Sequence, residues 1–148
     1  MRFHIIFLLT LLSTPLAPSV SIAEADAYQI TSGDKAFYEQ IKKAILAEDF
    51  DSFAAAVAYP IELYFAGERR LQPSSTRVRT KAQLKKYKSV ILDEHLKDVV
   101  RRQSADSLFK SWRGIMVGNG EIWFDQVQCK GSTNWTYRII AINSNYIR

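Results

Sequence analysis

Apolar residues recur at helical spacing between residues 37 and 45. The set that shares one helix face is Phe37, Ile41, Ala44 and Ile45. This spacing predicts an amphipathic helix with Ser32 or Asp34 as its N-cap. A second short helix is expected after Asp49 or Asp51. Tyr59-Pro60 ends it, because the residue before a proline avoids helical backbone.

A period of two replaces the helical period over residues 61–65. Apolar residues alternate there with Glu62 and Tyr64, which is typical of a half-buried strand. A loop follows, and the polar residues 77–79 predict a short return strand. The sequence therefore places a small two-stranded unit directly after the opening helices.

Helical and strand signals alternate in the second half of the chain. Thr80 with Gln83 forms a capping-box pattern, which predicts a helix start, and a further helical stretch begins near Asp93. Two apolar runs joined by Gly118-Asn119-Gly120 predict a β-hairpin, because these residues tolerate the positive φ of tight turns. A final strand is expected over residues 137–142. This order predicts an α+β fold with N-terminal helices packed on an antiparallel sheet.

The N-terminus has a different pattern, because an apolar run over residues 3–12 follows Arg2. Ala23-Glu24-Ala25 then offers small residues at the positions that a signal peptidase reads. The run is shorter than the ~20 apolar residues that span a bilayer. We therefore predict a cleavable signal peptide at residues 1–25 and a single α+β domain at 26–148. The domain is expected to be periplasmic or secreted and to lack a transmembrane segment.

Charge is distributed unevenly along a chain whose net charge is +5. Residues 26–66 carry a net charge of −4, whereas residues 67–88 carry +7. Such a basic block is either a solvated face or a docking surface for an anionic partner, because clustered charge steers association. The predicted partner-binding residues are Arg69, Arg70, Arg77, Arg79, Lys85 and Lys86.

Cysteine content limits the ways in which the domain is stabilised. Cys129 is the only cysteine, so no intramolecular disulfide can form. One histidine in the expected domain, His95, and one cysteine match no metal-ligand spacing, and no phosphate-binding loop is present. We therefore predict no metal and no cofactor. Nucleic acid is not expected as a partner, because an exported protein rarely meets it.

Two segments carry a family resemblance, namely Tyr59-Pro60-Ile61-Glu62-Leu63 and the hairpin over residues 114–124. Together with the order of elements, they resemble a periplasmic member of the nuclear-transport-factor-2-like superfamily. The resemblance implies a curved sheet that wraps a long helix into a cone with an apolar pocket. It implies little about activity, because members include isomerases, dehydratases, small-ligand binders and immunity proteins.

The resemblance also indicates which side chains an enzyme of this superfamily would need for catalysis. In the enzymes of the superfamily, an acid or a histidine in the cone moves a proton beside a tyrosine or a second acid. The side chains that fit these roles are Glu62, Tyr64 and His95. The pattern favours an outward polar strand face for Glu62 and Tyr64, and an exposed or half-buried helix position for His95. We therefore assign no catalytic residue from the sequence.

The function predicted from the sequence is binding rather than catalysis. The expected partner is an anionic protein surface or another envelope component, and the protein is a candidate toxin-neutralising immunity or inhibitor protein. The alternative is an isomerase or hydratase-like enzyme, or a ligand-binding protein, that uses the cone pocket. The sequence does not decide whether the protein forms a homodimer. A closed polar cavity containing Glu62 or His95 would favour the enzyme, and a filled cone would favour the binding protein.

Overall fold

The computed structural model of the protein describes residues 28–65, 74–128 and 131–144. The predicted signal peptide, Arg69, Arg70 and Cys129 lie outside the described residues. Within those ranges, no helix has the length and apolar character needed to cross a membrane.

Helices and strands follow one another in the order that the sequence pattern predicts. The helices are α2 (Ser32–Leu46), α3 (Phe50–Ala55), α4 (Lys81–Lys85), α5 (Lys88–Ile91) and α6 (Glu94–Arg102), with a 3-10 turn at Ala105–Ser107. The strands are β1 (Ile61–Phe65), β2 (Ser74–Val78), β3 (Phe109–Ser111), β4 (Gly114–Val117), β5 (Ile122–Gln128) and β6 (Trp135–Ser144). The α+β class is confirmed.

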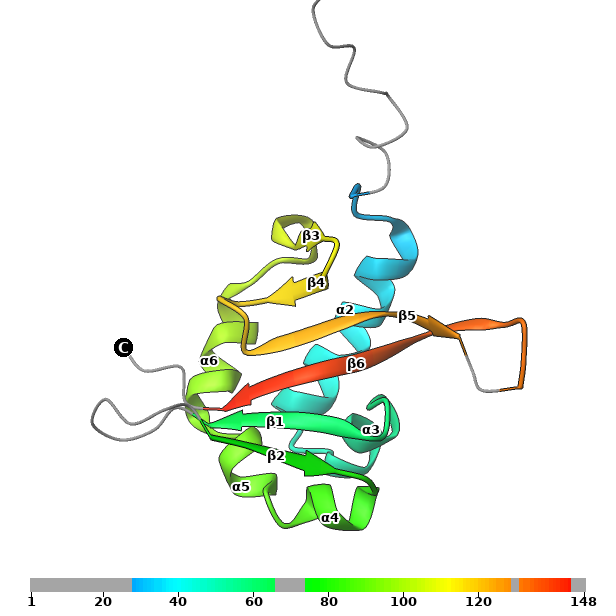
Figure 1. Cartoon of the computed structure of the whole chain (residues 1–148). Helices are drawn as coiled ribbons and strands as arrows, with labels where there is room; N and C mark the ends of the chain where they lie inside the picture. Colours follow the sequence, from blue (N-terminus) through cyan, green and yellow to red (C-terminus); the bar gives the residue numbers. More distant parts are fainter. Residues whose placement is uncertain (1–27, 66–73, 129–130, 145–148) are drawn as a thin grey trace, which may run out of the picture.

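The strands form one open, curved sheet of six strands in the order β2-β1-β6-β5-β4-β3 (Figure 1). Its neighbouring strands are antiparallel except for β1 and β6, which run parallel with Leu63 opposite Ile142. The prediction of an antiparallel sheet is therefore wrong for this pair. The parallel pairing is possible because β1 and β6 are far apart in the sequence. The long connection between them lets β6 enter the sheet between β1 and β5.

Helix α2 runs behind the sheet and supplies much of the core (Figure 1). Phe37, Ile41, Ala44 and Ile45 are buried, as the helical spacing predicts, and Tyr38 is buried in addition. The Phe37 ring lies 5.1 Å from that of Phe124 on β5 and 5.4 Å from that of Tyr137 on β6. Each fully buried side chain of this size stabilises the fold by roughly 1.5–3 kcal/mol. The helical face and the sheet therefore pack directly against each other.

The helix starts differ in detail from the sequence prediction. Thr31, and neither Ser32 nor Asp34, is the N-cap of α2. Its side chain accepts a hydrogen bond from the Asp34 amide, and the Asp34 carboxylate accepts one from the Thr31 amide. This reciprocal arrangement is a capping box in which aspartate takes the place usual for glutamate. The caps predicted at Asp49 and Thr80 are confirmed.

The β4–β5 hairpin confirms the turn predicted at residues 118–120. Gly118 has φ +64° and Gly120 has φ +109°, so both glycines occupy backbone that other residues rarely adopt. Strand β2 begins earlier than predicted, at Ser74, and Arg79 lies beyond its end. Strand β3 was not predicted from the sequence, and the helix predicted to start after Thr80 is divided into α4 and α5.

Candidate functional site

The predicted basic residues lie on two different parts of the surface. Val78 of β2 points into the core, so its neighbours Arg77 and Arg79 point outward and are exposed. Arg77 faces its strand partner Glu62 with 3.9 Å between Nε and Oε1. Lys85 and Lys86 lie instead at the end of α4, next to β2 (Figure 1). The basic block is thus divided between a sheet edge and a helix end.

An open groove with a volume of about 550 Å³ lies beside Lys85 and Lys86. Residues of α5 and its flanks contribute Lys85, Lys86, Lys88, Ser89 and Leu92. The α2–α3 turn and the start of α6 contribute Glu48, Asp93, Glu94 and Lys97. Both signs of charge therefore line the groove, and the basic Lys97 lies among the acidic residues.

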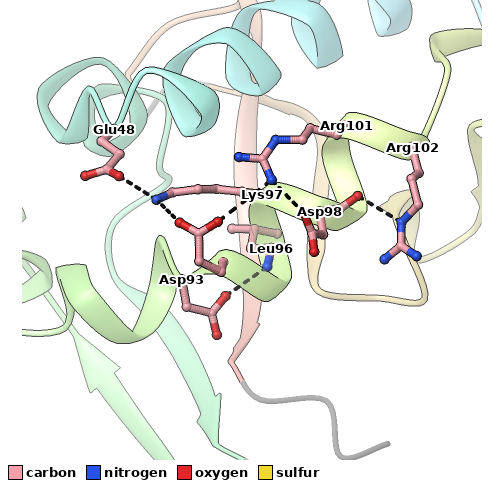
Figure 2. Close-up of polar contacts among 8 residues, drawn as sticks. Glu48, Asp93, Leu96, Lys97, Asp98, Arg101 and Arg102 are labelled. Carbon is pink, nitrogen blue, oxygen red and sulfur yellow. Dashed lines mark hydrogen bonds and ion pairs between the residues drawn. The ribbon is translucent and has the colours of Figure 1, made fainter.

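Lys97 is the buried charged residue of this groove, and its side chain is 8% exposed. Its Nζ donates to Oε1 of Glu48 at 2.5 Å and to Oε1 of Glu94 at 2.8 Å (Figure 2). The hydrogen bonds to Glu48 and then to Glu94 raise the pKa of Lys97, and the same contact lowers the pKa of Glu48. Arg101 extends the network by donating to Asp98 at 2.6 Å. The network joins α6 to the α2–α3 turn.

Glu48 has a backbone conformation that normally favours glycine, with φ +53°. The Glu48 amide donates to the carbonyl of Ile45, and the Asp49 amide donates to the carbonyl of Ala44. These two bonds define a Schellman motif that ends α2, and Glu48 occupies the position where glycine is most common. The chain therefore places a charged side chain at a strained position beside the groove.

The catalytic candidates are not brought together. Glu62 and Tyr64 share the outward face of β1, opposite the buried Ile61 and Leu63. His95 lies on α6, where its Nε2 is 3.0 Å from Oε1 of the buried Glu121. The structure thus separates the proposed acid and tyrosine from the histidine.

A small cavity lies next to His95 and Glu121. Its volume is about 10 Å³, which is close to the smallest space that holds one water molecule. Ser144 contributes a buried hydroxyl for which the described residues provide no hydrogen-bond partner. Neither Glu62 nor Tyr64 lines this cavity. A metabolite does not fit in a space of this size.

Glu121 was not identified from the sequence, although it holds the hairpin turn. Its Oε2 accepts a hydrogen bond of 2.6 Å from the Asn119 amide, while its Oε1 pairs with His95. Gln103 adds a second link, since its side chain accepts from the Gly118 amide at 2.8 Å. These contacts fix the β4–β5 turn against α6, which is a structural role. The sequence signal for Glu121 was a carboxylate directly after a glycine turn. This signal does not indicate the pairing with His95, which lies 26 residues away in the sequence.

A second buried carboxylate, that of Asp34, was considered only as a helix cap. Burial acts to raise its pKa, but hydrogen bonds from the Thr31 amide, Tyr137 and Lys110 outweigh burial, so the pKa is lowered. The Tyr137 hydroxyl donates at 2.8 Å and Lys110 Nζ at 3.2 Å. Since these donors occupy both carboxylate oxygens, Asp34 joins α2 to β6 and β3.

The described residues contain no group of three or more histidine, cysteine, aspartate and glutamate side chains placed to hold a metal ion. Comparison of the chain with protein-family models, with curated proteins and with solved structures finds no match. The groove and the basic residues beside it are therefore interpreted from their own geometry.

Proposed function

We propose that this is an exported, non-catalytic binding protein that docks an anionic protein partner through Arg79, Lys85 and Lys86. Arg77 and, beyond the described residues, Arg69 and Arg70 extend the same segment of the chain. We further propose that it is a periplasmic or secreted member of the nuclear-transport-factor-2-like superfamily. The curved sheet that packs against α2 supports this assignment.

The observation that carries the proposal is that these three basic side chains are exposed and form no salt bridge within the described part of the chain. Several lysines elsewhere pair with carboxylates, as Lys35 does with Asp106, Lys81 with Asp51 and Lys110 with Asp34. Arg79, Lys85 and Lys86 are exposed and form no ion pair with any described residue. Unpaired charges of one sign repel each other and attract an acidic surface, which raises the rate of encounter.

The packed interior supports binding at the surface. Within the described residues, α2 packs against the sheet through a continuous core that includes Phe37, Leu63 and Phe124. An interior of this kind leaves the surface as the place where a partner is recognised. A toxin-neutralising immunity or inhibitor protein is the particular role that we favour, because such proteins act by covering another protein.

The alternative function is an isomerase or hydratase-like enzyme, and one observation favours it. His95 and the buried Glu121 form a pair of the kind that moves protons in enzymes. The 10 Å³ cavity beside them argues against it, because a substrate does not fit in a space of that size. Loss of an activity on a small molecule in His95→Ala would support the enzyme.

Charge reversal tests the docking proposal. A partner is first captured from the envelope extract of the host, and its association is then measured with the triple variant Arg79→Glu/Lys85→Glu/Lys86→Glu. We expect association to slow by roughly tenfold or more at low salt and the difference to shrink as salt is added, because salt screens exposed charges.

The control makes the same change in net charge elsewhere on the surface. Lys43, Arg102 and Arg113 are also exposed, and none of them lines the groove. The variant Lys43→Glu/Arg102→Glu/Arg113→Glu should slow association much less. Association of the first variant at the wild-type rate in low salt would show that the docking proposal is wrong.

A further inference from the structure

The groove between α5 and α6 combines opposite charges with a strained acidic residue. We propose that it binds a small zwitterion, a free amino acid or dipeptide, whose ammonium group contacts Glu48 and Asp93 and whose carboxylate contacts Lys85, Lys86 and Lys88. All five residues line the groove. The proposal does not rest on the docking function, since it concerns the purified protein and a small molecule.

The backbone of Glu48 provides the first argument. A non-glycine residue with positive φ at this place costs free energy, and such residues concentrate at functional sites. Pairing with Lys97 uses only one oxygen of the Glu48 carboxylate, and Glu94 shares this role by accepting a hydrogen bond from Lys97 at 2.8 Å. Glycine would suit the Schellman motif better and would leave Lys97 paired. The carboxylate of Glu48 therefore has a further use.

The exposure of that carboxylate indicates what the use is. The Glu48 side chain is 57% exposed, and only its Oε1 contacts Lys97. Within the described part of the chain, Oε2 accepts no hydrogen bond. Asp93 has a similar arrangement, because its Oδ1 accepts from the Leu96 amide, while Oδ2 takes part in no hydrogen bond with a described residue (Figure 2). Two carboxylate oxygens at the groove are thus available to an ammonium group.

The lysines provide the opposite pole. Lys85, Lys86 and Lys88 line the groove, and none of them forms an ion pair with a described residue. A purely anionic ligand would meet Glu48, Asp93 and Glu94, and a purely cationic ligand would meet the lysines. Charges of both signs therefore favour a ligand that carries both, because a ligand with a single charge is attracted by some of the lining residues and repelled by the others.

The size of the groove fits a small molecule. A volume of about 550 Å³ lies within the range of small-ligand sites. The groove is open to solvent, so water screens each ion pair and the affinity is modest. We expect dissociation constants in the millimolar range.

A titration followed by amide NMR tests the proposal. The unmodified dipeptide Ala-Ala is compared with N-acetyl-Ala-Ala, which has lost its positive charge, and with Ala-Ala-amide, which has lost its negative charge. We expect saturable shifts of amide signals at Ser89, Glu94 and Lys97 with Ala-Ala. Each blocked peptide should bind about threefold to fivefold more weakly.

Three variants locate the site. Glu48→Gln and Lys86→Gln should each weaken Ala-Ala binding by about threefold to fivefold, whereas the control Lys43→Gln, on the exposed side of α2, should leave it unchanged. Lys86 is exposed and makes no ion pair with a described residue, so its substitution keeps the test valid if Glu48→Gln loses stability.

The proposal is overturned if Ala-Ala produces no saturable shifts. It is equally overturned if a blocked peptide binds as tightly as Ala-Ala. Neither result would bear on docking of a protein partner, which is measured separately.

Discussion

The hydroxyl of Tyr137 donates a hydrogen bond of 2.8 Å to Oδ1 of Asp34, and so joins the central strand β6 to the first turn of α2. The ring of Tyr137 also stacks on Phe37 from the same helix. A single residue of the sheet therefore fixes both the polar start and the apolar face of α2. This contact leads to a prediction about the pH dependence of stability.

Asp34→Asn should destabilise the protein at neutral pH by about 2 kcal/mol, because an amide cannot accept as strongly from Tyr137, Lys110 and the Thr31 amide. The pKa of Asp34 is lowered below its ordinary value of 3.8 in the folded state. Its stabilising contribution is therefore fully present above pH 3.8 and is lost as pH falls through the folded-state pKa.

Thermal melts at several pH values check this prediction. The gap in melting temperature between the wild type and Asp34→Asn should be largest at neutral pH and should close in acid. Asp106→Asn serves as the control, because Asp106 pairs with Lys35 at an exposed position and should have little effect. A gap that stays constant from neutral to strongly acidic pH would contradict the assignment.

Gly120→Val should lower the free energy of unfolding by about 1 kcal/mol or more, because a β-branched residue resists the φ of +109° found there. A side chain at this position would also approach Nε1 of Trp123, which lies 3.3 Å from the Cβ position. Urea denaturation measures the change. Asn119→Ala is the matched control in the same turn, because Asn119 is exposed and its hydrogen bond to Glu121 uses the backbone amide. An unchanged midpoint for Gly120→Val would contradict the hairpin geometry.

The protein isolated from its host should begin at or near Asp26, because Ala23-Glu24-Ala25 provides a signal-peptidase site directly before it. Intact-mass measurement or N-terminal sequencing checks this prediction. A chain that retains Met1 in a cytosolic fraction would show that the export proposal is wrong.

Local sequence signals were sufficient for most of the elements. The apolar spacing of α2 and the alternation in β1 each depend on residues within one element. The hairpin depends on Gly118 and Gly120, whose backbone requirement is also local. The parallel pairing of β1 with β6 was missed, because Leu63 and Ile142 are far apart in sequence and no local pattern specifies which strands become neighbours.

The same distinction applies to the functional site. The basic segment was visible as a run of like charge, and Lys85 and Lys86 were identified from it. Glu48 and Lys97 were not identified, because they meet across 49 positions. The strained backbone of Glu48 has no sequence signal, since nothing in the residue itself indicates a positive φ.

The central place of β6 determines the order in which this protein can be assembled. Strands β1 and β2 form one pair and β3, β4 and β5 form another set, and within the described sheet β6 alone lies between them. A nascent chain that lacks residues 135–144 can therefore form only two unconnected pieces, each with an unpaired edge. The sheet is completed after synthesis of its last strand, when most of the chain has already left the ribosome. Such late completion agrees with the proposed export, because a chain whose sheet is still incomplete passes through a translocation channel more easily than a folded one.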